Sequence, residues 1–132
     1  MTTSSTATTV LAEPLALACG VVLPNRILKG AMGEGLANPW TADVTPGLIR
    51  LYERWAEGGT GTLITGVICV ERGAEDNVIV ALDDKTDTGA LRRWATAVHR
   101  RDVRLLAQIQ HPGRTSTTPP TSSACSVMRA ST

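Results

Sequence analysis

The chain has 132 residues, of which 42% are hydrophobic and 19% charged, and its formal net charge is +1. These values exclude a chain that is disordered throughout, and they do not favour a nucleic-acid-binding surface. No apolar run approaches the ~20 residues that cross a membrane, and no basic segment at the N-terminus marks a secretory signal. The three cysteines, Cys19, Cys69 and Cys125, lack metal-ligand spacing and fit a reducing cytoplasm. We therefore expect a cytoplasmic protein without a metal site, nucleic-acid partner or membrane partner.

The first part of the chain predicts an arm, a hairpin and a strand. Residues 1–10 are mostly Ser and Thr and are expected to be disordered. Scattered apolar residues between Leu15 and Leu23, around Gly20, are compatible with a short hairpin. Residues 27–32 follow a Pro-Asn-Arg turn and predict a first strand, which runs into a glycine-containing loop.

Two amphipathic helices are predicted from their start and stop signals. The first begins at Thr45 and Pro46, an N-cap followed by proline at the first helical position, and ends at Gly58. The second begins at Asp87 or Thr88. Each helix has one apolar face with residues at i, i+3, i+4 and i+7. The two faces consist of Leu48, Leu51, Tyr52 and Trp55, and of Leu91, Trp94, Ala95 and Val98.

Two further strands alternate with these helices. Residues 62–66 predict the second strand, which residues 67–70 continue or follow after a bend, and residues 103–109 predict the third. Residues 72–80 are expected to form a longer loop. The order strand, helix, strand, helix, strand favours an α/β fold with a parallel sheet and right-handed crossovers. A doubly wound sheet and a (β/α)8 barrel share this order. Because a barrel needs about 250 residues, the chain is either a small open sheet or a piece of something larger.

Polar side chains gather where the third strand ends. The apolar residues Val103, Leu105, Leu106 and Ala107 are followed by Gln108, Gln110 and His111, and a Pro-Gly turn then ends at Arg114. Because α/β folds place their chemistry at the carboxyl ends of parallel strands, we interpret this stretch as a candidate site. An ordinary strand that enters an ordinary turn would give the same pattern.

The glycines after the first strand do not form a dinucleotide-binding loop. From Gly33 the pattern is Gly-x-Gly-x-x-Asn, so the third glycine is missing, and Pro39 follows. No helix N-terminus opens there to hold a pyrophosphate. Small residues such as Ala31, Gly33 and Gly66 would still let a flat ligand approach the strand ends. Tight packing between neighbouring strands would require the same residues.

Four segments, in order and spacing, resemble the start of the old yellow enzyme family. They are LPNRI at 23–27 leading to AM at 31–32, LYERWAEGG at 51–59, LITG at 63–66 and QIQHPGR at 108–114. This family comprises the NADH:flavin oxidoreductases, including the 2,4-dienoyl-CoA reductases. The resemblance implies a TIM barrel with FMN across its top and a hairpin across its bottom. Residues 11–114 would form the N-terminal part of that barrel, about three βα units with the preceding hairpin.

The resemblance also implies an activity and a set of site residues. FMN-dependent reduction of an activated alkene, usually an α,β-unsaturated carbonyl, is expected, with NADH or NADPH as the reductant. The implied cofactor-binding residues are Gly30, Ala31, Met32, Gly33, Gly66 and Gln108. Gln108 would present its amide to the pyrimidine edge of the flavin, which offers both donors and acceptors. His111 and Arg114 would shape the substrate rim. Many relatives have Thr or Cys at the position of Gly33, where the side chain bonds the flavin.

The segment after Arg114 does not resemble the family. Residues 115–132 are rich in Ser, Thr and Pro and are expected to be disordered. The groups that hold the substrate carbonyl and the flavin phosphate are expected beyond Arg114, so no catalytic residue is assigned. Two alternatives stay open, a non-catalytic truncated or frameshifted remnant and a small flavodoxin-like binding module.

Overall fold

The computed structural model describes residues 9–74 and 78–116. The arm and the tail that we expect to be disordered therefore lie outside the described residues, except for positions 9, 10, 115 and 116. Positions 9–12 form a helical turn. Within the described ranges, no helix has the length and apolar character that crossing a membrane requires. The same ranges contain no cluster of three or more His, Cys, Asp or Glu side chains that could hold a metal ion.

Both predicted helices are present, with the predicted caps. They are α2 (Pro46–Glu57) and α3 (Thr88–His99). The Thr45 hydroxyl accepts a hydrogen bond from the Leu48 N–H at 3.2 Å, and the Asp87 carboxylate accepts one from the Ala90 N–H at 3.0 Å. Each cap satisfies a backbone donor that has no partner within its helix, which fixes where the helix begins.

The main sheet is parallel and is built around one long strand. Its members are β3 (Leu28–Lys29), β4 (Thr62–Cys69), β5 (Val80–Ala81) and β6 (Arg104–Gln110). β6 pairs with the whole length of β4, whereas β3 and β5 pair with the first and last residues of β4 along its other edge. The ladder between β4 and β6 is irregular between Ile64 and Val67, as in a β-bulge.

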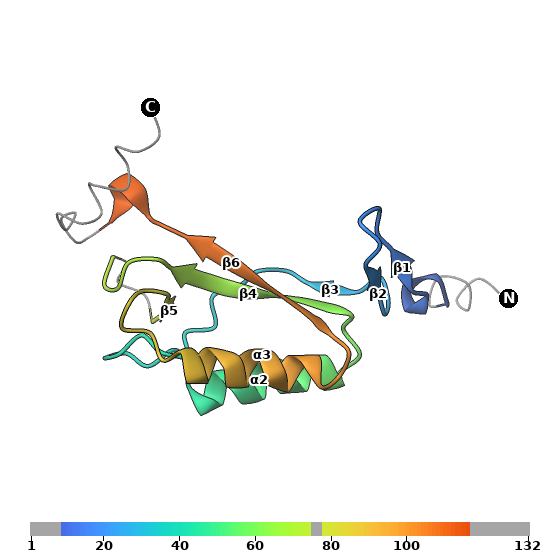
Figure 1. Ribbon diagram of the computed structural model, residues 1–132, viewed down its shortest axis with the longest axis horizontal. Helices are drawn as coiled ribbons and strands as arrows, with labels where there is room; N and C mark the ends of the chain where they lie inside the picture. The colour runs from blue at the N-terminus through green and yellow to red at the C-terminus, as the bar shows by residue number, and fades with distance from the viewer. Residues whose placement is uncertain (1–8, 75–77, 117–132) are drawn as a thin grey trace, which may run out of the picture.

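A separate hairpin precedes this sheet. β1 (Leu15–Ala16) and β2 (Val22–Leu23) pair antiparallel, and Gly20 takes a positive φ of 86° in the connection. This is the hairpin predicted from the scattered apolar residues. Figure 1 places it beyond the amino ends of β4 and β6, at the opposite end of the sheet from Gln108.

The two helices lie side by side on one face of the sheet (Figure 1). This confirms the predicted packing of both apolar helix faces against one side of the sheet. The buried core contains Leu48, Tyr52, Ala56, Leu63, Ile68, Trp94, Val98 and Val103, with Trp55 and Leu91 partly buried against it. The Tyr52 ring contacts Trp55 and Trp94 edge-on, each with a centroid distance of 4.9 Å. The other face of the sheet has no helix over it in the described chain.

Two boundaries differ from the sequence prediction. The first strand, expected over residues 27–32, pairs only at Leu28–Lys29. Beyond this point Glu34 accepts a hydrogen bond from the Tyr52 hydroxyl on α2, so this segment contacts the helix as well as β4. Val80–Ala81 pairs with β4, although residues 72–80 were expected to be loop. A strand of two residues is too short to show a periodicity.

Candidate functional site

The structure brings the three predicted flavin-lining segments together. Residues 30–33 follow β3, Gly66 lies within β4, and Gln108 lies in β6. Gln108 is level with Val67, the residue after Gly66. The Met32 carbonyl oxygen lies so close to Gly66 that a side chain at that position would overlap it. The segments therefore meet around the irregularity in β4, although they are far apart in the sequence.

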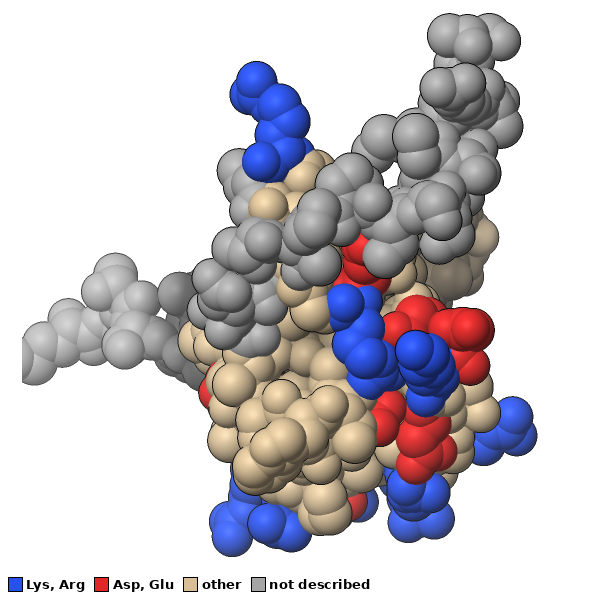
Figure 2. All heavy atoms as spheres, turned by 90° about the vertical axis from the view of Figure 1, so that its left-hand side faces the viewer, with Lys and Arg blue, Asp and Glu red and all other residues tan. Residues whose placement is uncertain are grey.

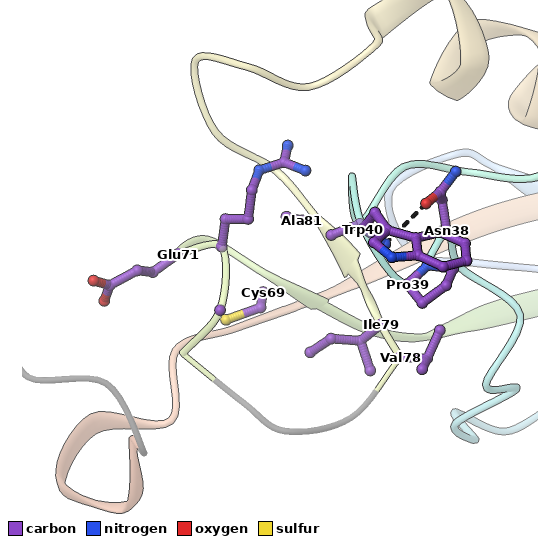
Figure 3. Close-up of a pocket in the computed structure, with 11 residues that line it drawn as sticks. Asn38, Pro39, Trp40, Cys69, Glu71, Val78, Ile79 and Ala81 are labelled. Carbon is purple, nitrogen blue, oxygen red and sulfur yellow. Dashed lines mark hydrogen bonds between the residues drawn. The ribbon is translucent and has the colours of Figure 1, made fainter.

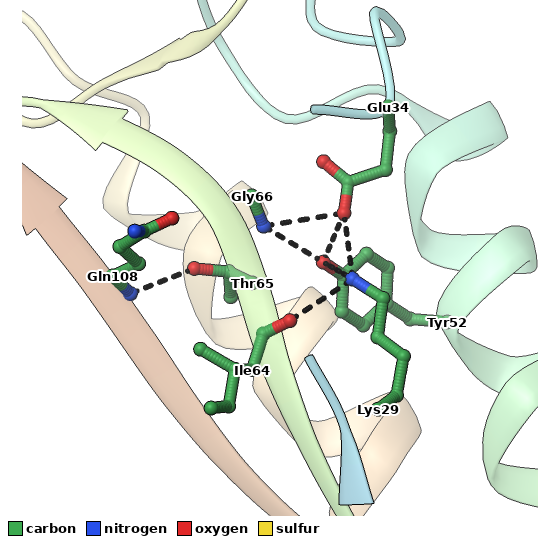
Figure 4. Close-up of polar contacts among 7 residues, drawn as sticks. All are labelled: Lys29, Glu34, Tyr52, Ile64, Thr65, Gly66 and Gln108. Carbon is green, nitrogen blue, oxygen red and sulfur yellow. Dashed lines mark hydrogen bonds and ion pairs between the residues drawn. The ribbon is translucent and has the colours of Figure 1, made fainter. Parts of the chain in front are cut away.

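The backbone at residues 30–33 and the side chain of Gln108 are accessible. A Cβ atom added at Gly30 or Gly33 would have no other heavy atom within 4 Å. The Gln108 N–H donates to the Thr65 hydroxyl at 2.9 Å (Figure 4), while its carboxamide forms no hydrogen bond to another described residue. Exposed backbone beside a free amide fits the edge of a flat heterocycle that offers donors and acceptors. The donor set present is therefore compatible with a flavin ring.

Gly66 is required by packing. Its N–H donates to the Tyr52 hydroxyl at 3.1 Å and to Glu34 Oε1 at 3.2 Å. Any side chain at this position would overlap the Glu34 carboxylate as well as the Met32 carbonyl. The N–H of Gly66 is thus engaged within the protein. The predicted contact of Gly66 with the flavin edge stays a prediction.

A buried polar cluster of Lys29, Glu34 and Tyr52 lies directly behind this site (Figure 4). The Lys29 ammonium is 3.2 Å from Glu34 Oε1 and 3.3 Å from the Tyr52 hydroxyl, and it donates to the Ile64 carbonyl at 3.0 Å. The Tyr52 hydroxyl donates to Glu34. Burial, followed by the hydrogen bond to the Glu34 carboxylate, raises the pKa of Tyr52 far above its ordinary value. The Tyr52 hydroxyl therefore stays protonated and donates a hydrogen bond to Glu34.

This cluster was not among the functional residues predicted from the sequence. The signal that could have found it is Lys29, a charged residue within an otherwise apolar strand. A buried ammonium needs a partner, and Glu34 is the nearest acidic residue along the chain. The pattern could not indicate that Tyr52, placed on the apolar face of a predicted helix, would complete the group.

The two predicted rim residues lie in the loop after β6. His111 Nε2 is 2.8 Å from Glu71 Oε2, and His111 Nδ1 accepts a hydrogen bond from the Gly113 N–H at 2.8 Å. Because Nδ1 accepts, the ring proton is on Nε2 and is donated to Glu71. Arg114 lies in the short 3-10 turn Gly113–Thr115, and it is exposed. His111 thus ties the loop after β6 to the loop after β4, and the rim role of both residues stays a prediction.

A hollow of about 210 Å³ lies near the carboxyl ends of β4 and β5 (Figure 3). Its lining includes Trp40, Cys69, Glu71, Arg72 and Ile79. Two hydrogen bonds of 3.0 Å each join the Arg72 guanidinium to the Asp83 carboxylate. Acidic and basic side chains intermingle on this end of the molecule (Figure 2). The hollow contains none of the predicted flavin-lining residues.

Similarity to known proteins agrees with the geometry, although no protein-family model matches the chain. The NADH-dependent flavin oxidoreductases iccE of Talaromyces variabilis and iliE of Hypocrea jecorina are 36% and 37% identical to it, over 79% and 76% of this chain. The solved old yellow enzyme from Trypanosoma cruzi matches with a TM-score of 0.71 at 19% identity, covering 90% of this chain and 33% of that one. The chain spans about a quarter, 26%, of the length of both curated relatives.

The parallel strands and their helices therefore correspond to part of a TIM barrel. Over about three quarters of its own length the chain is similar to NADH-dependent flavin oxidoreductases, and it has the fold of the solved old yellow enzyme. Both this resemblance and the fold class were predicted from the four sequence segments, and both are confirmed.

Proposed function

We propose that this chain supplies one wall of the FMN site in an oxidoreductase that reduces activated alkenes, such as α,β-unsaturated carbonyl compounds, with NADH or NADPH. The observation that carries the proposal is the convergence of residues 30–33, Gly66 and Gln108 around one point of β4. The relatives named as NADH-dependent flavin oxidoreductases support a flavin and a nicotinamide reductant.

Each part of this wall has a defined task. When bound, FMN would supply the hydride that reaches the β-carbon of the alkene. The Gln108 carboxamide would donate to and accept from the pyrimidine edge of the ring. The open backbone at Gly30 and Gly33 would let the ring lie close to β3. Because Gly33 has no side chain to bond the flavin, the backbone and Gln108 carry the recognition in this part of the site.

A second candidate function is that of a non-catalytic polypeptide. It is favoured by the exposed apolar side chains of Leu106 and Ile109 on β6. In that case the chain would fold around its helices and carry no activity of its own.

The test is a fusion of this chain to the part of iccE that the match does not cover. We expect the fusion to purify with FMN and to oxidise NADH or NADPH when an α,β-unsaturated ketone is present. In the fusion, Gln108→Ala should weaken FMN binding by about 1–3 kcal/mol, as for loss of a polar contact in a buried site. Thr96→Ala, an exposed position on α3, is the matched control. A folded fusion that is colourless would overturn the proposal.

A further inference from the structure

The Lys29–Glu34–Tyr52 cluster joins three elements beneath the sheet. Lys29 comes from β3, Glu34 from the segment after β3, and Tyr52 from α2. Tyr52 is fully buried, and the side chains of Lys29 and Glu34 are only 13% and 8% exposed. The Lys29 ammonium also lies over the rings of Tyr52 and Trp55, at 5.0 and 4.5 Å from their centroids. A buried charge pair of this kind is tolerated only where every polar group has a partner.

Here the side chains of Lys29, Glu34 and Tyr52 all have hydrogen-bond partners. One Glu34 oxygen receives the Tyr52 hydroxyl, the Lys29 ammonium and the Gly66 N–H. Lys29 in turn donates to the Ile64 carbonyl. The Ile64 carbonyl and the Gly66 N–H lie on either side of Thr65. The cluster therefore hydrogen-bonds to β4 at the irregularity. Removal of one partner would leave another charge buried and unpaired.

Thr65 and Gly66 of β4 contact the segments that are predicted to line the flavin. On one side, the Glu34 carboxylate and the Met32 carbonyl press against Gly66, which holds residues 32–34 against β4. On the other side, the hydroxyl of Thr65 receives the Gln108 N–H in place of a backbone partner. The position of Gln108 therefore depends on the shape that the cluster imposes on β4.

We propose that Glu34, supported by Tyr52 and Lys29, is a positioning residue for the flavin site. It fixes the segment after β3 against the irregularity of β4 and thereby sets where residues 30–33 and Gln108 face the ring. This rests on the proposed FMN function and adds that the determinants of site geometry lie on the helix-covered side of the sheet, out of contact with the cofactor.

The test has two arms. One reports whether the cluster orders the segment, and the other reports whether that order affects FMN binding. The first measures amide hydrogen exchange at Gly66 and Gln108 in the chain without flavin. The second measures the dissociation constant and absorption spectrum of FMN in the fusion. Glu34→Ala should speed exchange of both amides about 10-fold or more and weaken FMN binding about 10-fold, because the hydrogen bonds to the segment are lost. Glu34→Gln keeps an acceptor of the same size but leaves the buried Lys29 ammonium without its counter-charge, so it should recover only part of both losses.

Two further variants separate positioning from stability. Tyr52→Phe keeps the ring and removes the hydroxyl, so it should act in the same direction as Glu34→Ala. Val98→Ala opens the core at a residue that is not part of the Lys29–Glu34–Tyr52 cluster, and it should lower the unfolding free energy without changing the FMN spectrum. Equal FMN affinity and spectra in all variants would overturn the positioning role and leave the FMN function intact. Rapid exchange of Gly66 and Gln108 in the wild type would also overturn it. If the wild-type fusion binds no FMN, the proposed function fails, and the exchange arm alone decides whether the cluster orders the segment.

Discussion

The two faces of the sheet differ in how far their apolar side chains are buried. On the helix-covered face, Leu48, Leu63 and Val98 are buried in one core. On the opposite face, Leu28 and Leu106 are each 51% exposed. Near the start of β6 the two environments alternate, since Leu105 packs on the core whereas Leu106 points away from it. A single layer of helices thus completes one side of this structure and leaves the other as apolar surface.

The two faces also carry different groups of the candidate site: one carries the residues proposed to contact the flavin, and the other carries the residues that hold them in place. The candidate recognition groups, residues 30–33 and Gln108, are exposed, while the groups that hold them, Glu34 and Tyr52, are on the covered side. Gly66 lies between the two sides and touches both segments. The covered face can therefore be tested by its effect on stability, and the open face by its effect on ligand binding and association.

The largest expected effect concerns the open face as a whole. The chain by itself should retain no FMN, whereas the fusion should be yellow. The exposed side chains of Leu106 and Ile109, and the edge of β6 that pairs with no other described strand, leave the ring site without support on that side. FMN also needs cationic groups and backbone amides for its phosphate, which the residues assigned to the ring do not provide. Gel filtration with absorption at the flavin band decides it, and a yellow chain that elutes as an active monomer would contradict the argument.

The next effect lies in the covered core. Leu48→Ala should lower the free energy of unfolding by about 2–5 kcal/mol, since it removes a buried side chain from between α2 and the sheet. Urea denaturation followed by tryptophan fluorescence measures it, because Trp55 and Trp94 lie in or against the same core. Leu51→Ala, at a half-buried position of the same helix, is the control and should cost less.

Gly66→Ala should destabilise the chain by about 1–3 kcal/mol, as expected for overpacking of a filled site. The added methyl group would overlap the Glu34 carboxylate and the Met32 carbonyl. Gly33→Ala is the matched control, because a Cβ there meets open space. Urea midpoints of the two variants give the comparison, and equal midpoints would mean that residues 32–34 do not rest on β4 as described.

Much of the covered face was predictable from the sequence. Thr45 and Asp87 are residue types that commonly cap helices, so both helix starts could be predicted. The spacing of the apolar residues in each helix reflects the one face that the helix buries. The family resemblance grouped three segments that are far apart in the sequence as candidates for flavin contact, and the structure brings them together. Their contact with the flavin stays a prediction.

The interactions that hold the wall were not predictable. The bond from Gln108 to Thr65 joins residues 43 positions apart and depends on an irregularity that no periodicity marks. Likewise, Tyr52 has the spacing of a core residue, and only the fold reveals that its hydroxyl meets Glu34. Polar contacts across strands depend on register, which a local pattern does not specify.

A smaller effect should appear at acid pH in the ion pair of Arg72 and Asp83. Hydrogen bonds from the Arg72 guanidinium hold the pKa of Asp83 below its usual value. A carboxyl whose pKa is lower in the folded state stabilises the fold above its unfolded pKa of about 4, and this contribution is lost as the pH falls through the folded pKa. The difference in urea midpoint between the wild type and Asp83→Asn should therefore be constant near neutral pH and shrink below about pH 4. A difference that grows on acidification would contradict this assignment.

The smallest effect on the stability of the chain by itself is expected on the open face, at Leu106. In the chain alone, Leu106→Ala should change the unfolding free energy by no more than about 0.5 kcal/mol, because the side chain already contacts water. The same substitution in the fusion should cost about 2–5 kcal/mol, since completing the barrel would bury this face. Leu48→Ala, buried in either context, should cost the same in both and serves as the internal control. Denaturation of the four variants therefore measures directly how much of the open face becomes core. An equal, small cost of Leu106→Ala in both proteins would mean that this face is a true surface, and it would favour the non-catalytic alternative.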